Sequence, residues 1–238
     1  MTSSSAPSLE IVALDRADIA YAPWSWPFAA SRRADIETYF ADLCRRRSGI
    51  WNGRVLLLNG CTIEGRALHG DCFETDYASF CSWRDWGFPD TSVYNVFAAS
   101  ALRSADGAFL VGEMAASTAN AGLVTFPCGT PEPADLDAAG CLDLAANLGR
   151  ELLEETGIGM DEVRAEPGWT MVRDRRFLAL VKVIAAPENA EVLRARVMRH
   201  LAAEQRPEFV DVRLVRSPAD LDPAMPPFIP AFLTDLWA

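Results

Sequence analysis

Two spacings of apolar residues alternate along the chain, one typical of helices and one of strands. Between residues 32 and 47, the side chains of Ile36, Tyr39, Phe40 and Leu43 recur every three or four positions, which predicts an amphipathic helix. The next segment, GRVLLLNGCTIEGRALHGDCFETDY, alternates short β-prone runs with Asn-Gly and Glu-Gly turn signals. We expect an antiparallel meander there, followed by a short helix in ASFCSWRDWGF.

The first 30 residues follow neither spacing for long. They combine short apolar runs with the turn-rich stretch YAPWSWPFAA, where Pro23 and Pro27 oppose a regular helix because proline lacks an N–H donor. We interpret this region as an arm that wraps around the rest of the protein.

The pattern of apolar and polar residues changes near Ser92, where strand-like and helical segments begin to alternate. YNVFAASALRSADGAFLVGEM predicts two strands about an Asp-Gly turn, and LVTFPCGTPEP leads into a loop at residues 131–140. The remaining expected elements are a helix in DLAANLGRELLEET, strands in WTMVRD, FLALVKVIAA and VDVRLV, a helix in AEVLRARVMRHLAAE, and helical turns in the tail.

This order of elements predicts an α/β protein with a mixed sheet that helices cover on both faces. We expect two parts. Residues 1–91 would form an N-terminal arm, a helix and a small, mainly antiparallel α+β subdomain, and residues 92–238 would form the larger domain.

The stretch RELLEETGI, residues 150–158, places three carboxylates near the end of a helix. Acids there oppose the helix dipole and repel one another, so we expect a compensating charge. At 100° per residue, Glu151, Glu154 and Glu155 share an arc of about 100°, and Arg150 can orient Glu154. We expect the acids to face outward, because the wheel puts an apolar stripe opposite them, formed by Ala145, Ala146, Gly149, Leu152 and Leu153 with Leu148 at its margin.

The net charge of −11 makes a multivalent cation the natural partner of these acids. It argues against nucleic acid or an anionic membrane, which both need clustered cations. Hard oxygen ligands suit Mg²⁺ or Mn²⁺, whereas six cysteines without a CxxC pair and only two histidines disfavour a zinc site. Lacking a signal-peptide pattern or a long apolar run, the chain is expected to be cytoplasmic, with reduced thiols.

Residues 150–158 also match the second half of a known motif. The chain resembles the Nudix hydrolases, whose box is written G-x5-E-x7-R-E-U-x-E-E-x-G-U, where U is aliphatic. Upstream, FPCGTPEPAD resembles the strand end and glycine loop of that family, with Gly129 as the box glycine. The resemblance implies that residues 92–238 are a Nudix hydrolase domain, an α/β/α sandwich around a mixed sheet.

The box departs from the family pattern in its length. The pattern spans 23 positions and Gly129 to Ile158 spans 30, so seven residues are inserted in the loop before the helix. Counting forward from Gly129 places Asp135 at the first box acid, whereas counting back from Arg150 reaches the neighbour of Asp143. Both stay candidates, although Asp143 could simply cap the helix. The longer loop could contribute to substrate choice.

The resemblance implies a hydrolase of phosphoric anhydride bonds, with Mg²⁺ or Mn²⁺ as cofactor. It would cleave the diphosphate of a nucleoside diphosphate linked to another moiety. Glu151, Glu154 and Glu155 would bind the metal, with the Gly129 carbonyl as a further ligand, and Arg150 would orient the carboxylates.

Many family members add an acid from a loop well after the box, as a ligand or as a base. Here LAAEQRPEFVDVRLV offers Glu204 and Glu208, with Asp211 as a third choice. We expect Glu204 or Glu208 to join Arg150 and Glu154 in the catalytic group.

The substrate is less well indicated. WNGRVLLLNG, ETDYASF and FPCGTPEP resemble a Nudix branch that hydrolyses UDP-sugars, which favours a nucleotide-sugar. Coenzyme A, dinucleotides or ADP-ribose are alternatives, as is a non-catalytic Nudix scaffold that binds a nucleotide or a partner protein. The N-terminal part could assist substrate binding or form a homodimer.

Overall fold

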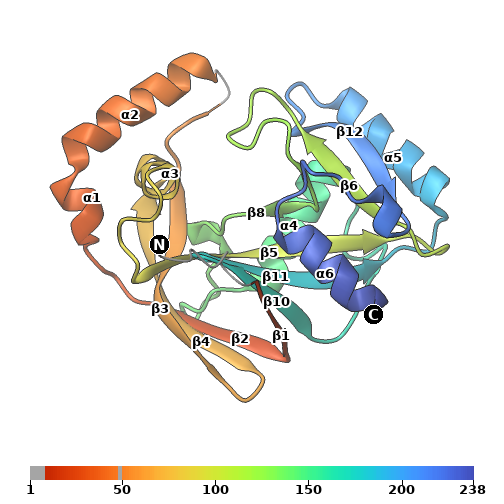
Figure 1. Ribbon diagram of the computed structural model, residues 1–238, viewed down its shortest axis with the longest axis horizontal. Coiled ribbons are helices and arrows are strands. Elements are labelled where there is room, and N and C mark those ends of the chain that lie inside the picture. Colours follow the sequence, from red (N-terminus) through yellow and green to blue (C-terminus); the bar gives the residue numbers. More distant parts are fainter. Residues whose placement is uncertain (1–8, 48–49) are drawn as a thin grey trace, which may run out of the picture.

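The computed structural model describes residues 9–47 and 50–238, and a 12-stranded sheet runs through its centre (Figure 1). The strands are β1 (Glu10–Leu14), β2 (Arg16–Tyr21), β3 (Arg54–Glu64), β4 (Ala67–Asp76), β5 (Val93–Arg103), β6 (Phe109–Met114), β7 (Val124–Thr125), β8 (Cys128–Gly129), β9 (Arg164–Ala165), β10 (Trp169–Asp174), β11 (Phe177–Ala185) and β12 (Phe209–Val215). The helices are α1 (Pro27–Ser31), α2 (Arg33–Arg46), α3 (Tyr77–Asp85), α4 (Leu144–Thr156), α5 (Ala190–Ala203) and α6 (Phe228–Trp237), with short 3₁₀ turns at Pro133–Asp135 and Pro218–Asp220.

The sheet is mixed, as the sequence predicts. Its main order is β1-β10-β11-β5-β3-β4-β2, and β6, β7 and β12 form a branch that joins β5 at its end. The pairs β5–β11 and β2–β4 are parallel, whereas β3–β4, β3–β5, β10–β11 and β1–β10 are antiparallel. The short strand β8 pairs with the middle of β5, which brings the loop after Gly129 onto the sheet.

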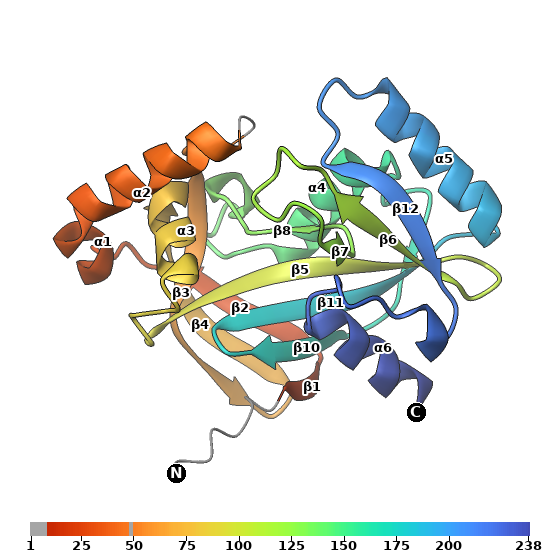
Figure 2. The same cartoon turned by 45° about the horizontal axis from the view of Figure 1, so that its top comes forward.

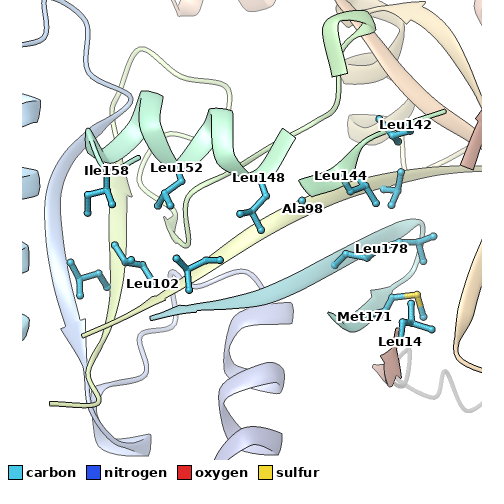
Figure 3. Packing of buried hydrophobic residues seen from close by; sticks show 14 of the residues in the cluster. Leu14, Ala98, Leu102, Leu142, Leu144, Leu148, Leu152, Ile158, Met171 and Leu178 are labelled. Atoms are coloured by element: carbon cyan, nitrogen blue, oxygen red, sulfur yellow. The ribbon is translucent and has the colours of Figure 1, made fainter. Parts of the chain in front are cut away.

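Helices cover both faces of the sheet, which confirms the predicted α/β class. On one face, the leucines of α4 pack on β5, with Leu148 and Leu152 above Ala98 and Leu102 (Figure 3), and α5 packs on β12 and β6. On the other face, α6 lies against the sheet (Figure 2). Its Phe228 and neighbouring apolar side chains share one cluster with side chains of β5 and β11. A third cluster holds α1, α2 and α3 against β3 and β4.

The N-terminal predictions are largely confirmed. The amphipathic helix is α2, the meander is the β3–β4 hairpin, and the short helix is α3. The arm is wrong in part: within its described residues, β1 and β2 are regular sheet strands, and a helix begins at Pro27. Proline is tolerated there because the first residue of a helix needs no N–H partner within the helix.

The expected boundary near residue 91 crosses a continuous sheet. β1 pairs with β10, and β3 pairs with β5 at Leu58 and Tyr94. Leu56 N also donates to the carbonyl of Pro131 at 2.7 Å, so the meander supports the glycine loop directly. Among the described residues, no helix is long and apolar enough to cross a membrane. All six cysteines are free thiols.

Candidate functional site

The acidic helix α4 has well-defined ends. Asp143 is its N-cap, since its Oδ1 accepts hydrogen bonds from Ala145 N at 3.0 Å and Ala146 N at 2.9 Å. Gly157 ends the helix in the left-handed conformation, with φ of 69°, where a residue with a Cβ would be strained. The helix therefore spans the residues that its sequence predicts.

The face that α4 buries differs from the one expected. Leu144, Leu148 and Leu152 form the buried stripe at a four-residue spacing, and Glu155 continues it at only 3% exposure. Leu153 is 52% exposed, and Ala145 and Ala146 are also exposed. The prediction of outward-facing acids is thus wrong for Glu155 and, in part, for half-buried Glu151. The three leucines are bulkier than the alanines of the expected stripe, and burying them turns the acids toward β8.

Glu155 is held against β8 by the backbone. Cys128 N donates to Glu155 Oε2 at 2.9 Å. Burial raises the pKa of Glu155 well above its usual range, and repulsion from Glu151 and Glu208 adds to the effect. A buried carboxylate among other acids is costly, so it needs a compensating cation or a proton.

Glu151 lies directly against Gly129. A Cβ built on Gly129 would come within 2.1 Å of Glu151 Oε1, so only glycine fits at this position while Glu151 stays in place. Burial raises the pKa of Glu151 to about 7, against the lowering effect of Arg150, and Glu154 and Glu208 raise it further. Glycine and glutamate from the two halves of the box therefore meet in space.

Arg150 connects the acids on its side of the helix. Its Nε and Nη2 donate to Asp135 Oδ1 and Oδ2 at 3.2 and 3.0 Å. Its Nη1 donates to Glu154 Oε2 at 3.0 Å, and its Nη2 lies 2.8 Å from Glu151 Oε1. The guanidinium fixes two of the predicted metal ligands relative to the glycine loop.

Asp135 and Asp143, the two candidates for the first box acid, have different roles. Asp135 is buried and accepts hydrogen bonds from Asn147 Nδ2 and Glu132 N as well as from Arg150. Asp143 caps the helix instead. The acid beside the arginine is therefore Asp135, and the extra residues lie between it and α4.

Of the later acids, Glu208 is the one whose charge acts on Glu151 and Glu155, and its side chain is exposed to solvent. Its charge raises the pKa of Glu151 and of Glu155, and its own pKa is raised by partial desolvation and then by Glu154. Glu204 lies where α5 ends and is not among the main charges that act on Glu151 or Glu155, so its expected catalytic place is not supported. Asp211 is paired with Arg194 at 2.8 Å.

His200 is a contact that the sequence did not indicate. Its Nε2 lies 3.0 Å from the carbonyl oxygen of Glu154, and a Cβ on Gly157 would meet its ring at 2.7 Å. A histidine at this point satisfies a helix-end carbonyl that would otherwise lack a partner. No local signal could have revealed it, because the two partners lie 46 residues apart in the sequence.

The donor set suits a hard cation, although no cage for one is preformed. Within residues 9–47 and 50–238, no group of three or more His, Cys, Asp and Glu side chains is arranged to hold a metal ion. Burial and the neighbouring acids nevertheless raise the pKa values of Glu151 and Glu155, and the missing side chain of Gly129 leaves room for Glu151. Mg²⁺ and Mn²⁺ bind carboxylate oxygens, and either cation would offset the repulsion among these acids.

The inserted loop packs away from the acids. Tyr21 N donates to Gly140 O at 2.8 Å and Leu142 N donates to Ile19 O at 2.9 Å, so the loop extends the sheet at β2. With β2, β3 and β4 it lines a cavity of about 840 Å³ at the N-terminal end of α4. The residues lining this cavity include none of the carboxylates grouped beside Gly129.

Comparisons with known proteins reveal distant likenesses to solved structures. No protein-family model matches the chain, and no curated protein matches it. It is similar to RenU, a Nudix hydrolase from M. smegmatis (13% identity, 60% of this chain and 83% of that chain, TM-score 0.39). It is also similar to the MutT protein of Methanosarcina mazei Go1 (17% identity, 60% of this chain and 91% of that chain, TM-score 0.39). A third similar structure is Tm1382, a proposed Nudix hydrolase (13% identity, 77% of this chain and 99% of that chain, TM-score 0.44). Likenesses this distant carry no argument about activity.

Proposed function

We propose that this chain is a Nudix-type hydrolase that depends on Mg²⁺ or Mn²⁺. It would cleave the diphosphate of a nucleoside diphosphate linked to another moiety. The observation that carries the proposal is that Glu151 lies against Gly129 and buried Glu155 against Cys128 N, with Arg150 holding Glu151 and Glu154. A protein without use for a cation gains nothing from burying carboxylates that repel one another.

Each residue of the group has a chemical task in this proposal. Bound at these oxygens, the metal would neutralise phosphate charge and activate the attacking water. Glu151, Glu154 and Glu155 supply carboxylate oxygens, the Gly129 carbonyl supplies a further one, and Arg150 keeps Glu151 and Glu154 oriented. The raised pKa of Glu208 suits a general base that accepts the proton of the attacking water.

A nucleotide-sugar is the first substrate class to assay, because of the N-terminal segments that resemble the UDP-sugar branch. Coenzyme A, dinucleotides and ADP-ribose carry the same diphosphate linkage and belong in the same panel. The phosphate-containing products should be identified for each substrate, since they reveal which bond is cleaved.

The decisive experiment compares the unaltered protein with Glu154→Gln on this panel at saturating Mg²⁺. We expect kcat to fall about a hundredfold, because the variant loses charge where the transition state needs it. Glu162→Gln is a matched control on an exposed glutamate that pairs with Arg196. Undiminished turnover by Glu154→Gln would exclude the metal assignment.

A binding measurement separates the enzyme from a scaffold. Mg²⁺ at about one hundred times its Kd should stabilise the unaltered protein by about 2.7 kcal/mol, and Glu154→Gln should lose most of this gain. A non-catalytic Nudix scaffold would be favoured if no substrate were turned over and the nucleotide affinity were the same with and without Mg²⁺.

A further inference from the structure

A surface loop joins the acid group to the N-terminal helices. Residues 115–122 connect β6 with β7, and the loop begins with Ala115, whose N–H donates to the carbonyl of Glu208 at 2.7 Å. Thr118 N donates back to Ala115 O at 3.0 Å, closing a turn. The middle of the loop is therefore one hydrogen-bonded turn away from the backbone of Glu208.

The same turn is contacted from the other side by Arg47, at the end of α2. Its Nη1 donates to Thr118 O at 3.0 Å and also contacts Ala119 O. From α3, Arg84 reaches Asn120 Oδ1 at 3.4 Å. The N-terminal helices and the acid group thus hold opposite sides of one short loop.

The two arginines differ in their hydrogen-bond partners. Arg84 binds Asp85 through Nε at 2.7 Å and Nη2 at 3.3 Å, and its guanidinium lies 5.6 Å from the ring centre of Phe80. Asp85 also accepts a hydrogen bond from Tyr39, so its oxygens are engaged. Half-buried Arg47 directs its hydrogen bonds in the described chain to two neutral carbonyls, and its charge reaches Asp85 only over a longer distance, where it helps to lower the pKa of that carboxylate.

Electrostatics place α3 and the acid group within each other's influence. The pKa of Tyr77, the first residue of α3, is raised by burial and also by the charge of Glu208. Glu208 in turn raises the pKa values of Glu151 and Glu155. The charge of Glu208 therefore reaches α3, and the 115–122 loop provides the direct contact between Glu208 and α2.

An anionic substrate needs a cation in addition to the metal in such a setting. The chain carries a net charge of −11, and the acids described above would repel a nucleotide from this part of the surface. A guanidinium bonded only to carbonyls can exchange them for phosphate oxygens, because charge-assisted hydrogen bonds are about twice as strong as neutral ones.

We propose that Arg47 is a substrate-binding residue, which contacts an anionic group of a nucleoside-diphosphate substrate held at the acid group. The proposal rests on the proposed function and adds a contact from the N-terminal part. On binding, the guanidinium leaves the carbonyls of Thr118 and Ala119, and the 115–122 loop is released from α2. Arg47 takes no part in the bond-breaking step, so it contributes to affinity rather than to turnover.

Steady-state kinetics of Arg47→Ala and Arg47→Gln test the proposal, on whichever substrate the panel identifies. We expect KM to rise about tenfold in both variants, with kcat changed by less than about threefold. Arg47→Gln keeps an amide donor for the loop carbonyls but removes the charge, so it separates anion binding from a structural latch. Arg47→Lys, which keeps the charge, should restore part of the affinity.

The matched control is Arg45→Ala, which removes the same charge from the same helix. Arg45 is 70% exposed and pairs with Asp42, so its loss should leave KM unchanged. Calorimetry with α,β-methylene-ADP in the presence of Mg²⁺ gives a second readout. Its Kd should weaken about tenfold in Arg47→Gln and stay the same in Arg45→Ala.

The outcomes keep the two proposals apart. An unchanged KM in Arg47→Gln, or an equal rise in Arg45→Ala, would overturn the role of Arg47 while turnover by the unaltered protein left the proposed function standing. A lower melting temperature with unchanged KM and Kd would reduce Arg47 to a structural latch. An unaltered protein that neither cleaves the panel nor binds α,β-methylene-ADP would overturn both.

Discussion

Glu155 occupies a position on α4 that a leucine would fill in an ordinary amphipathic helix. It continues the buried stripe of Leu144, Leu148 and Leu152, and its pKa is raised by burial and by neighbouring acids. Folding is penalised in either form, since the carboxylate is desolvated as an anion and must take up a proton to become neutral. Under the proposed function, Glu155 lowers the stability of the fold and in return supplies a ligand for the metal.

Replacing Glu155 with glutamine should therefore stabilise the metal-free protein while it impairs activity. The amide oxygen can still accept the hydrogen bond from Cys128 N, and the penalised charge is removed. In EDTA at neutral pH, we expect the melting temperature to rise by at least about 2 °C, with kcat falling about a hundredfold in Mg²⁺. Glu162→Gln is the control, and because its pKa is lowered by Arg196, this change should not stabilise.

Gly129 is defined by close approach rather than by a special backbone conformation. A methyl group there would meet Glu151 Oε1 at 2.1 Å, so Gly129→Ala should displace the carboxylate and lower kcat about a hundredfold without unfolding the protein. Gly149→Ala is the matched control. Its new Cβ would meet only the flexible chain of Met160, and alanine favours the helix, so activity and melting temperature should be retained or improved.

At the scale of elements, α4 is positioned by two aspartates with separate tasks. Asp143 binds the first N–H groups of the helix, whereas Asp135 anchors Arg150. The residues inserted between them reach β2, so the loop is attached to the sheet at a distance from the acids. This arrangement explains how the box can be longer than the family pattern without disturbing its helix.

These two aspartates should respond differently to substitution. Asp143→Ala should lower the free energy of unfolding by about 1 kcal/mol through the lost cap, with kcat unchanged. Asp135→Asn should lower kcat by about tenfold or more, because Arg150 loses its bidentate partner and no longer fixes Glu151 and Glu154. Urea unfolding and steady-state kinetics on both variants check the assignment, and reversed effects would contradict it.

At the scale of the whole molecule, the N-terminal part and the box share one sheet. β1 pairs with β10, β3 pairs with β5, and the 115–122 loop joins Glu208 to α2 and α3. Separating the chain near residue 91 would expose two strand edges and remove the support of the glycine loop. The two parts differ in their pattern of predicted elements, and strand pairs join them in one sheet.

A fragment of residues 92–238 should therefore fail to fold alone. We expect weak, poorly dispersed amide signals in its NMR spectrum, and no stable fragment beginning near residue 92 after limited proteolysis of the full chain. Co-expression with residues 1–91 as a separate chain should restore solubility, because the missing strands are supplied. A fragment that unfolds cooperatively on its own would show that the boundary marks independent domains.

The sequence by itself determined most elements, the mixed α/β class, and the helix that carries Glu151, Glu154 and Glu155. These features depend on local periodicity and turn chemistry, which are written in neighbouring residues. The pairing of Gly129 with that helix was implied by the family resemblance alone. The wrapping arm was wrong in part because the short apolar runs of residues 10–21 form strands that pair with β10 and β4.

Only the tertiary structure decided which face of α4 is buried and that Asp135 rather than Asp143 meets Arg150. It also brought Arg47 to the loop beside Glu208. Each of these results depends on contacts between segments far apart in the chain. Helical periodicity states which side chains share a face, but the surface packed against that face determines whether a glutamate or an alanine lies inside.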